Sequence, residues 1–144
     1  MLKHATNHTQ NRYLQFEKMI NCIFNNKEIE INSKSELSSL MKSGMENEFS
    51  EICLYEKDKT SLTVLTNKIE KKAFLMFQDL EKEISYVPII SKNPSELYVD
   101  FLLSNGQMDE YPTNWLVDFE LAKKSIIEYF INRQMWNGIN WNEE

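Results

Sequence analysis

Five short apolar segments, separated by polar breaks of only a few residues, follow one another through the middle of the chain. They are rich in the aromatic and β-branched side chains that favour strands, and turn-forming residues bound them. Spacing of this kind is typical of antiparallel hairpins joined in a meander. The five candidate strands are residues 51–56, 61–66, 72–78, 84–90 and 96–104.

One turn near the end of this region has a strong signature. Asn105-Gly106 is a two-residue hairpin signal, because both residue types tolerate positive φ. The dipeptide predicts that residues 98–103 fold back onto residues 108–111.

A capped helix is predicted ahead of the strands. Ser33 and Glu36 form an S-x-x-E capping box, in which each side chain bonds the other residue's backbone N–H. The apolar spacing that follows predicts a helix over 34–43, with Gly44 as the C′ residue.

The segment before this helix shows apolar residues at near-helical spacing. It predicts an amphipathic helix over 11–25, ended by Asn25-Asn26. Residues 28–31 then alternate like a short strand.

The last part of the chain has the clearest helical pattern. Asp118 is a plausible N-cap, and apolar side chains recur on one helix face as far as Phe130. Residues 138–141 predict a short final strand. The side chains expected in the core here are Phe119, Ala122, Ile126, Phe130 and Trp141.

This order of elements predicts an α+β fold. We expect an antiparallel β-sheet meander of about five to seven strands with N-terminal helices, and an amphipathic C-terminal helix followed by a short final strand. The length is that of a single domain, 1–144, in which residues 1–10 are a flexible tail and residues 11–27 a helical extension.

The formal net charge of −6 is unevenly distributed. Residues 1–27 hold four basic side chains against one acidic, or +3, so residues 28–144 hold −9. An acidic body repels phosphates, which argues against direct nucleic-acid binding and suits a basic partner. Mild acidity that serves solubility alone explains the same number equally well.

Targeting signals are missing from the sequence. No stretch of about 18 apolar residues predicts a membrane span, and the N-terminus lacks the apolar core of a signal peptide. The cysteines, Cys22 and Cys53, form no C-x-x-C pair and are expected to be free thiols. We therefore expect a cytoplasmic protein without a membrane partner.

Signatures of catalysis are mostly missing as well. The sequence has no P-loop, dinucleotide-binding, H-E-x-x-H or G-x-S-x-G motif. The two histidines, His4 and His8, lie in a polar tail with no third metal ligand nearby, so no metal or cofactor is expected. Asp109-Glu110 is a dense carboxylate pair, for which a solvated hairpin edge is a better interpretation than acid–base catalysis. We therefore expect no catalytic residues and no enzyme.

The C-terminal arrangement carries a resemblance. Residues 115–117 lead into the helix that ends in Glu128-Tyr129-Phe130, and a polar loop precedes Ile139-Asn140-Trp141. This order resembles the first-described immunity family of bacterial polymorphic toxin and contact-dependent growth inhibition systems. Upstream, the strand and capped helix from residue 28 and the strands that follow are similar in pattern. The chain departs from that family at 134–137, where Gly and Pro are usual.

The resemblance implies an immunity protein. Its partner would be the C-terminal domain of a cognate toxin, commonly a nuclease or a nucleic-acid deaminase, and it would occlude the toxin's active site or substrate groove. Such a toxin has a basic groove that an acidic inhibitor can match. A small ligand-binding or scaffold α+β protein is the alternative, and a hydrolase using carboxylates a more distant one.

The contact residues are predicted from acidic and aromatic positions at the hairpin and in the last loop. In that loop, Trp136 is predicted to be an exposed aromatic anchor. The predicted toxin-binding residues are Asp100, Asp109, Glu110, Tyr111 and Trp136.

Overall fold

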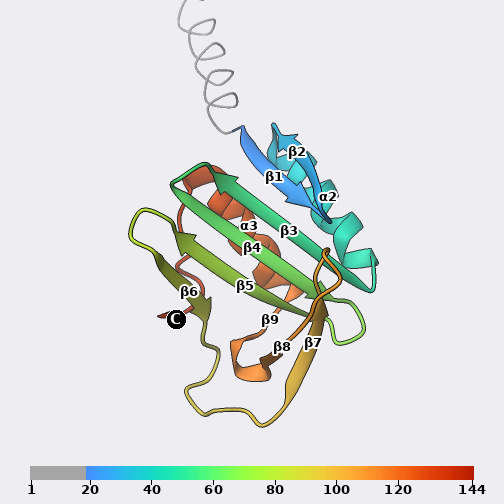
Figure 1. The fold of residues 1–144 in the computed structure, drawn as a ribbon, viewed down its shortest axis with the longest axis vertical. Coiled ribbons are helices and arrows are strands. Elements are labelled where there is room, and N and C mark those ends of the chain that lie inside the picture. Colours follow the sequence, from blue (N-terminus) through green and yellow to red (C-terminus); the bar gives the residue numbers. More distant parts are fainter. Residues whose placement is uncertain (1–18) are drawn as a thin grey trace, which may run out of the picture.

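The computed structural model describes residues 19–144 as two helices, a short 3₁₀ turn and ten strands (Figure 1). The helical elements are α2 (Lys34–Glu46), η1 (Thr113–Trp115) and α3 (Phe119–Asn132). The strands are β1 (Ile20–Phe24), β2 (Lys27–Ile31), β3 (Phe49–Glu56), β4 (Thr60–Asn67), β5 (Lys72–Asp79), β6 (Ile84–Pro88), β7 (Tyr98–Leu102), β8 (Met108–Pro112), β9 (Val117–Asp118) and β10 (Trp141–Glu143).

The main sheet is antiparallel and has the strand order β10-β6-β5-β4-β3-β1-β2, with β9 paired to β5. Strands β3 to β6 are neighbours in chain order, so the predicted meander and the predicted α+β class are confirmed. The fifth candidate strand does not join it. Residues 98–102 form β7, which pairs only with β8 in a separate two-stranded sheet. The predicted pairing of the hairpin is confirmed, but its turn is longer than the two residues expected: the Leu103 N–H donates to the Gln107 carbonyl, and Gly106 has a positive φ of 90° while Asn105 does not.

The N-terminal helix predicted over 11–25 is wrong at its described end. Ile20–Phe24 is strand β1, which pairs with both β2 and β3. Asn25 and Asn26 have φ of 46° and 72°, so they form the tight turn of a β1–β2 hairpin instead of ending a helix. Residues 1–18, with the predicted tail, the start of that helix, and His4 and His8, lie outside the described part of the chain.

The capping box before α2 is present with one change. The Glu36 N–H donates to Ser33 Oγ at 3.1 Å, while Glu36 Oε2 accepts from the N–H of Asn32 at 2.9 Å, one residue earlier than the usual partner. The predicted end of the helix is wrong, because α2 continues past Gly44 to Glu46. Gly44 is buried against the sheet, where a Cβ would meet Ser50 Oγ at 3.0 Å. Glycine is needed there for close packing, not for a turn.

Helix α3 begins where the sequence predicts. Asp118 caps it by accepting from the Leu121 N–H at 2.8 Å, and the helix ends at Arg133, which has left-handed backbone geometry. Ala122 and Ile126 are buried as predicted. Helix α3 has 14 residues. No helix within residues 19–144 is long and apolar enough to span a membrane.

The final strand lies slightly later than predicted, at Trp141–Glu143 instead of 138–141. The preceding residues turn tightly, because the Trp136 ring fills the space that a Cβ at Gly138 would occupy. The Trp141 indole N–H donates to the Trp136 carbonyl at 2.9 Å, and this bond closes the turn. Trp141 is half-buried against the core instead of fully buried, and the same is true of Phe119.

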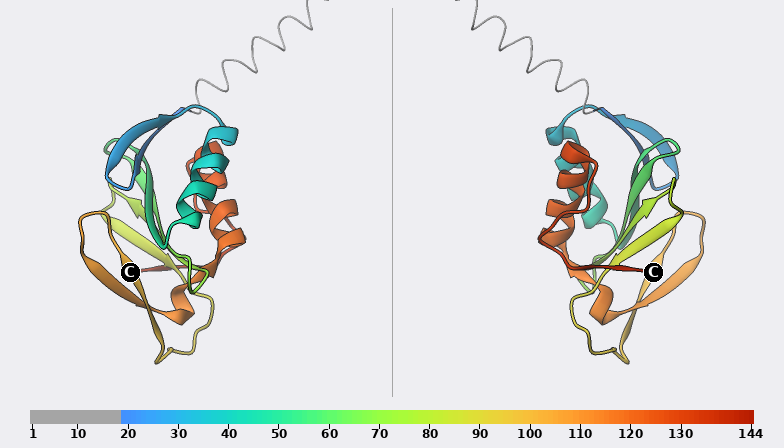
Figure 2. Two further views of the ribbon diagram at one scale, coloured as in Figure 1. Left: turned by 90° about the vertical axis from the view of Figure 1, so that its right-hand side faces the viewer. Right: turned by 90° about the vertical axis from the view of Figure 1, so that its left-hand side faces the viewer.

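The two faces of the main sheet are covered differently (Figure 2). Helices α2 and α3 lie on one face, which we call the helix face, and the β7–β8 hairpin lies on the other, which we call the hairpin face. Each face has its own cluster of buried apolar side chains. Leu75 of β5 belongs to the first cluster and its neighbour Phe74 to the second, as alternation along a strand requires.

Candidate protein-binding surface

The β7–β8 hairpin is attached to the main sheet at two points. In the middle, Asn67 Nδ2 at the end of β4 donates to the backbone carbonyl of Asp100 at 2.8 Å. At the tip, Glu51 Oε1 of β3 accepts from the N–H and the hydroxyl of Ser104 at 2.8 and 2.6 Å. These bonds hold the hairpin in a defined position over the sheet, so its outer side is a fixed surface.

The inner side of the hairpin is apolar and aromatic. Val99 and Phe101 are buried, and the Tyr111 ring stacks on Phe74 of the sheet with centroids 3.7 Å apart and planes within 2°. Trp115 extends the aromatic group, with its ring centroid 6.4 Å from that of Tyr111. These contacts fasten the hairpin to the sheet.

A polar network borders this aromatic group. The Tyr111 hydroxyl donates to Asp109 Oδ2 at 3.1 Å, and Gln107 Nε2 donates to Asp109 Oδ1 at 2.7 Å. Burial, the Asp109 carboxylate and the charge of Glu144 together raise the pKa of Tyr111 to about 12. The phenol therefore stays protonated at neutral pH, and Asp109 serves the hairpin's own structure.

The outer side carries charge among apolar side chains. Asp100 and Glu110 are directly opposite each other in the β7–β8 register, and both are exposed. Around them Tyr98 is 56%, Leu102 38% and Met108 53% exposed. We call these five residues the hairpin outer surface.

The opposed carboxylates are unfavourable for the hairpin by itself. Like charges directly opposite each other on neighbouring strands destabilise the pair. Neither Asp100 nor Glu110 forms an ion pair with another residue of 19–144. A basic group from a partner would relieve this repulsion, so the surface suits a cationic ligand with apolar neighbours.

The five predicted contact residues are thus divided by the fold. Asp100 and Glu110 point outward from the hairpin, and Asp109 and Tyr111 face inward. Trp136 belongs to neither group, because it packs half-buried against the helix-face core with Lys124 Nζ 5.9 Å from its ring centroid. The prediction that Trp136 is an exposed anchor is wrong.

The apolar part of this surface is not among the residues predicted from the sequence. Tyr98, Leu102 and Met108 were assigned to strands without regard to which side they face. The signal was available in β7, where apolar residues occupy both alternating sets instead of one. Such a strand has a second apolar side that one core cannot bury.

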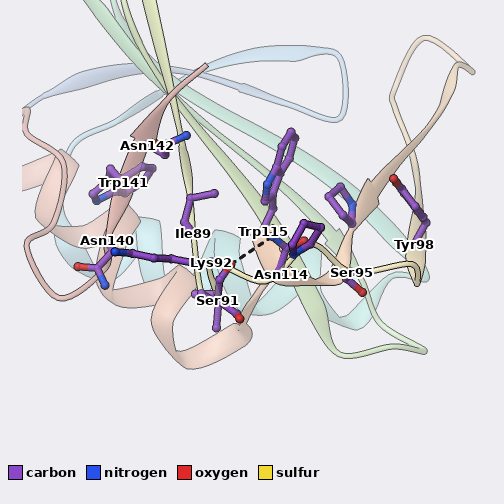
Figure 3. A pocket seen from close by; sticks show the side chains of 13 residues that line it. Ile89, Ser91, Lys92, Ser95, Tyr98, Asn114, Trp115, Asn140, Trp141 and Asn142 are labelled. Atoms are coloured by element: carbon purple, nitrogen blue, oxygen red, sulfur yellow. Dashed lines mark hydrogen bonds between the residues drawn. The ribbon is translucent and has the colours of Figure 1, made fainter.

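A groove of about 700 Å³ opens beside the hairpin, between the segment after β6 and strand β10 (Figure 3). Its walls include the rings of Tyr98, Trp115 and Trp141, and among residues 19–144 Lys92 is the one charged residue that lines it. Asn114 Nδ2 donates to the Ser91 carbonyl at 3.2 Å, while the buried Asn114 Oδ1 has no partner among the described residues. The groove has the size of a small-molecule site.

The thiols are not placed for catalysis. Cys22 is paired with Leu54, and both side chains lie on the helix face. Cys53 precedes Leu54 in β3, so its side chain points to the hairpin face. Both cysteines are free. Burial raises the pKa of Cys22 to about 12 and raises that of Cys53 as well, so neither thiol is activated. In residues 19–144 no three His, Cys, Asp or Glu side chains come together as metal ligands.

Comparison with known proteins adds no relative to this description: no family model and no curated protein matches the sequence.

Proposed function

We propose that this chain is an immunity protein that binds the C-terminal domain of a cognate toxin and covers its active site or substrate groove. The observation that carries the proposal is the hairpin outer surface, where two opposed carboxylates without an ion-pair partner in residues 19–144 lie among exposed apolar side chains. The resemblance of residues 28–144 to an immunity family points the same way. In this proposal the chain acts in the cytoplasm as a binder, without a reaction of its own.

The charge of the partner follows from the charge of the surface. A nuclease or nucleic-acid deaminase binds phosphates in a basic groove, and the carboxylates of Asp100 and Glu110 can occupy the positions of those phosphates. The net charge of −6 adds long-range attraction, which speeds association and weakens as salt is added. The apolar ring of Tyr98, Leu102 and Met108 would exclude water from the charged contacts and slow dissociation.

Co-expression with the toxin domain encoded beside this chain tests the proposal. Growth should be rescued, and the two proteins should purify as one complex. A matched culture with a catalytically dead toxin domain shows whether the complex forms without toxicity. If the active toxin stops growth although the chain is folded and abundant, the proposal is wrong.

The groove favours a second candidate, a small-ligand-binding protein. It is aromatic-lined and includes Asn114, whose buried amide oxygen has no hydrogen-bond partner within residues 19–144, and this combination suits a flat ligand with an N–H donor. Titration of such fragments, followed by the indole N–H signals of Trp115 and Trp141, tests it. Shifts at both signals that saturate with one fragment class would favour this candidate; no shift with any fragment would remove it.

A further inference from the structure

The outer edge of the main sheet at β2 is open. Strand β2 is last in the sheet order, pairs with β1, and has no other strand beside it within residues 19–144 (Figure 1). An open edge presents unpaired backbone N–H and C=O groups, which another chain can use to add a strand.

The register shows which backbone groups are free. Strand β1 lies between β2 and β3. Just past its end, the Asn25 N–H donates to the Glu51 carbonyl of β3 at 2.9 Å. The odd-numbered residues of β1 therefore bond to β3 and its even-numbered residues to β2. Those even-numbered residues are paired with the odd-numbered residues of β2. Glu28 and Glu30 therefore direct their backbone groups outward, to the open edge.

The two sides of this edge differ in charge, with the exposed Lys27 on the side of Ile29 and Ile31 and two glutamates on the other. Ile31 is buried beneath the helices, so Ile29 lies on the same side, where it is 37% exposed. Glu28 and Glu30 lie on the opposite side, and both are exposed. Next to Ile29, a groove of about 480 Å³ separates β2 from α2, and it is lined by Ile31, Leu40 and three serines together with Glu30 and Glu36. An added strand would thus meet the carboxylates of Glu28 and Glu30 on one side and a groove of mixed apolar and polar lining on the other.

A second copy of the chain does not fit this edge. A symmetric strand pair is antiparallel, and the outward backbone groups would be those of Glu28 and Glu30 in both copies. Every such register places a carboxylate opposite another carboxylate, which is destabilising. A strand with basic residues at those positions is favoured instead.

We propose that the β2 edge binds an extended segment of the toxin domain in which basic and apolar residues alternate, adding it to the sheet as a further strand. This inference rests on the proposed function and gives the toxin a second point of attachment. Its basic side chains would face Glu28 and Glu30, and its apolar side chains would enter the groove beside Ile29.

Two substitutions at one position separate backbone pairing from charge. Glu30→Pro and Glu30→Ala both remove the carboxylate, but only proline removes the outward N–H, and proline is accepted on the solvent side of an edge strand. Relative to Glu30→Ala, Glu30→Pro should bind the toxin domain about tenfold more weakly, the usual effect of one lost main-chain hydrogen bond. Circular dichroism and the unfolding midpoint show whether each variant folds.

Amide exchange on the wild-type complex gives an answer that needs no variant. Binding should slow exchange at the N–H groups of Glu28 and Glu30. Equal affinities for the two variants together with unprotected amides would overturn the inference while leaving a neutralising complex intact. Protection of the same amides in the chain alone, with dimer formation, would overturn it in favour of a second copy. If the wild type forms no complex, the proposed function fails first and this inference with it.

Discussion

The two faces of the main sheet differ in how many apolar side chains they bury. The helix face buries a cluster of nineteen described residues beneath α2 and α3, whereas the hairpin face buries six beneath β7–β8. Buried apolar area is the main source of folding free energy, so most of the stability comes from the helix face. The hairpin adds little to it and carries the exposed charge and apolar surface.

This difference predicts where amino-acid substitutions are tolerated. A small cluster fastened by a ring stack and a few hydrogen bonds can open locally without unfolding the rest. Substitutions in the hairpin should therefore be tolerated better than substitutions in the helix-face core. Substitutions on the two faces should differ in size and in kind.

The largest effect is expected on the helix face. Leu75 is fully buried in the large cluster, so Leu75→Ala should lower the free energy of unfolding by about 3–4 kcal/mol. Leu80→Ala is a matched control, because Leu80 is 45% exposed, and it should cost under about 1 kcal/mol. Urea unfolding followed by circular dichroism measures both. Similar costs for the two would contradict the assigned core.

An intermediate and local effect is expected on the hairpin face. Phe101 is fully buried, but the hairpin can release without loss of the sheet, so Phe101→Ala should cost about 2 kcal/mol. Amide exchange should accelerate across 98–112 and stay unchanged across β5. Uniform acceleration through the whole chain would mean that the two faces unfold as one unit.

The smallest effect is expected from one hydroxyl. Tyr111→Phe keeps the ring stack and loses the bond to Asp109, at a cost of about 1 kcal/mol at pH 7. The pKa of Tyr111 is raised to about 12 in the folded state, so the unfolded chain loses this proton first as pH rises. Wild-type stability should therefore fall between pH 10 and 12.

The stability of the Tyr111→Phe variant should fall less steeply than that of the wild type between pH 10 and 12. Some decline remains, because burial also raises the pKa values of Tyr129 and Cys22 to about 12. Unfolding midpoints measured at intervals across this pH range give the two slopes. Identical slopes would mean that the Tyr111 phenol is not protected from ionisation in the folded protein.

Local signals made much of the fold predictable. The β3–β6 meander, the Ser33 and Asp118 caps and the β7–β8 hairpin depend on neighbours in sequence, and all are present, although the hairpin turn is longer than the two residues expected. Strand β1 was missed because Ile20 and Phe24 suit a helix face as well as one face of a strand. Pairing with β3, nearly thirty residues later, decides between them, and spacing alone does not contain that information.

The candidate surface was only partly predictable for the same reason. Residue type selected Asp100 and Glu110 correctly as exposed, but it could not separate them from Asp109, which faces inward. The hairpin leaves the main sheet and covers it, which fixes the outward set, and this depends on contacts between distant segments. Trp136 was misassigned because the filling of a turn by its ring depends on Gly138 and on the core behind it.

The most direct test of the account is the toxin domain's affinity for two charge-reversed variants. Asp100→Lys plus Glu110→Lys changes the hairpin outer surface, and Glu81→Lys plus Glu83→Lys makes the same charge change in the exposed β5–β6 turn. The first variant keeps a like-charge pair, so its stability should stay within about 0.5 kcal/mol of the wild type.

Titration calorimetry at low and high salt measures the affinities. The account predicts that the hairpin variant binds at least about a hundredfold more weakly, as expected when two opposed charges are reversed in an interface, and that the turn variant loses a few-fold at low salt only. Equal losses for the two variants would mean that only the net charge matters, and would contradict the hairpin outer surface as the toxin-binding site.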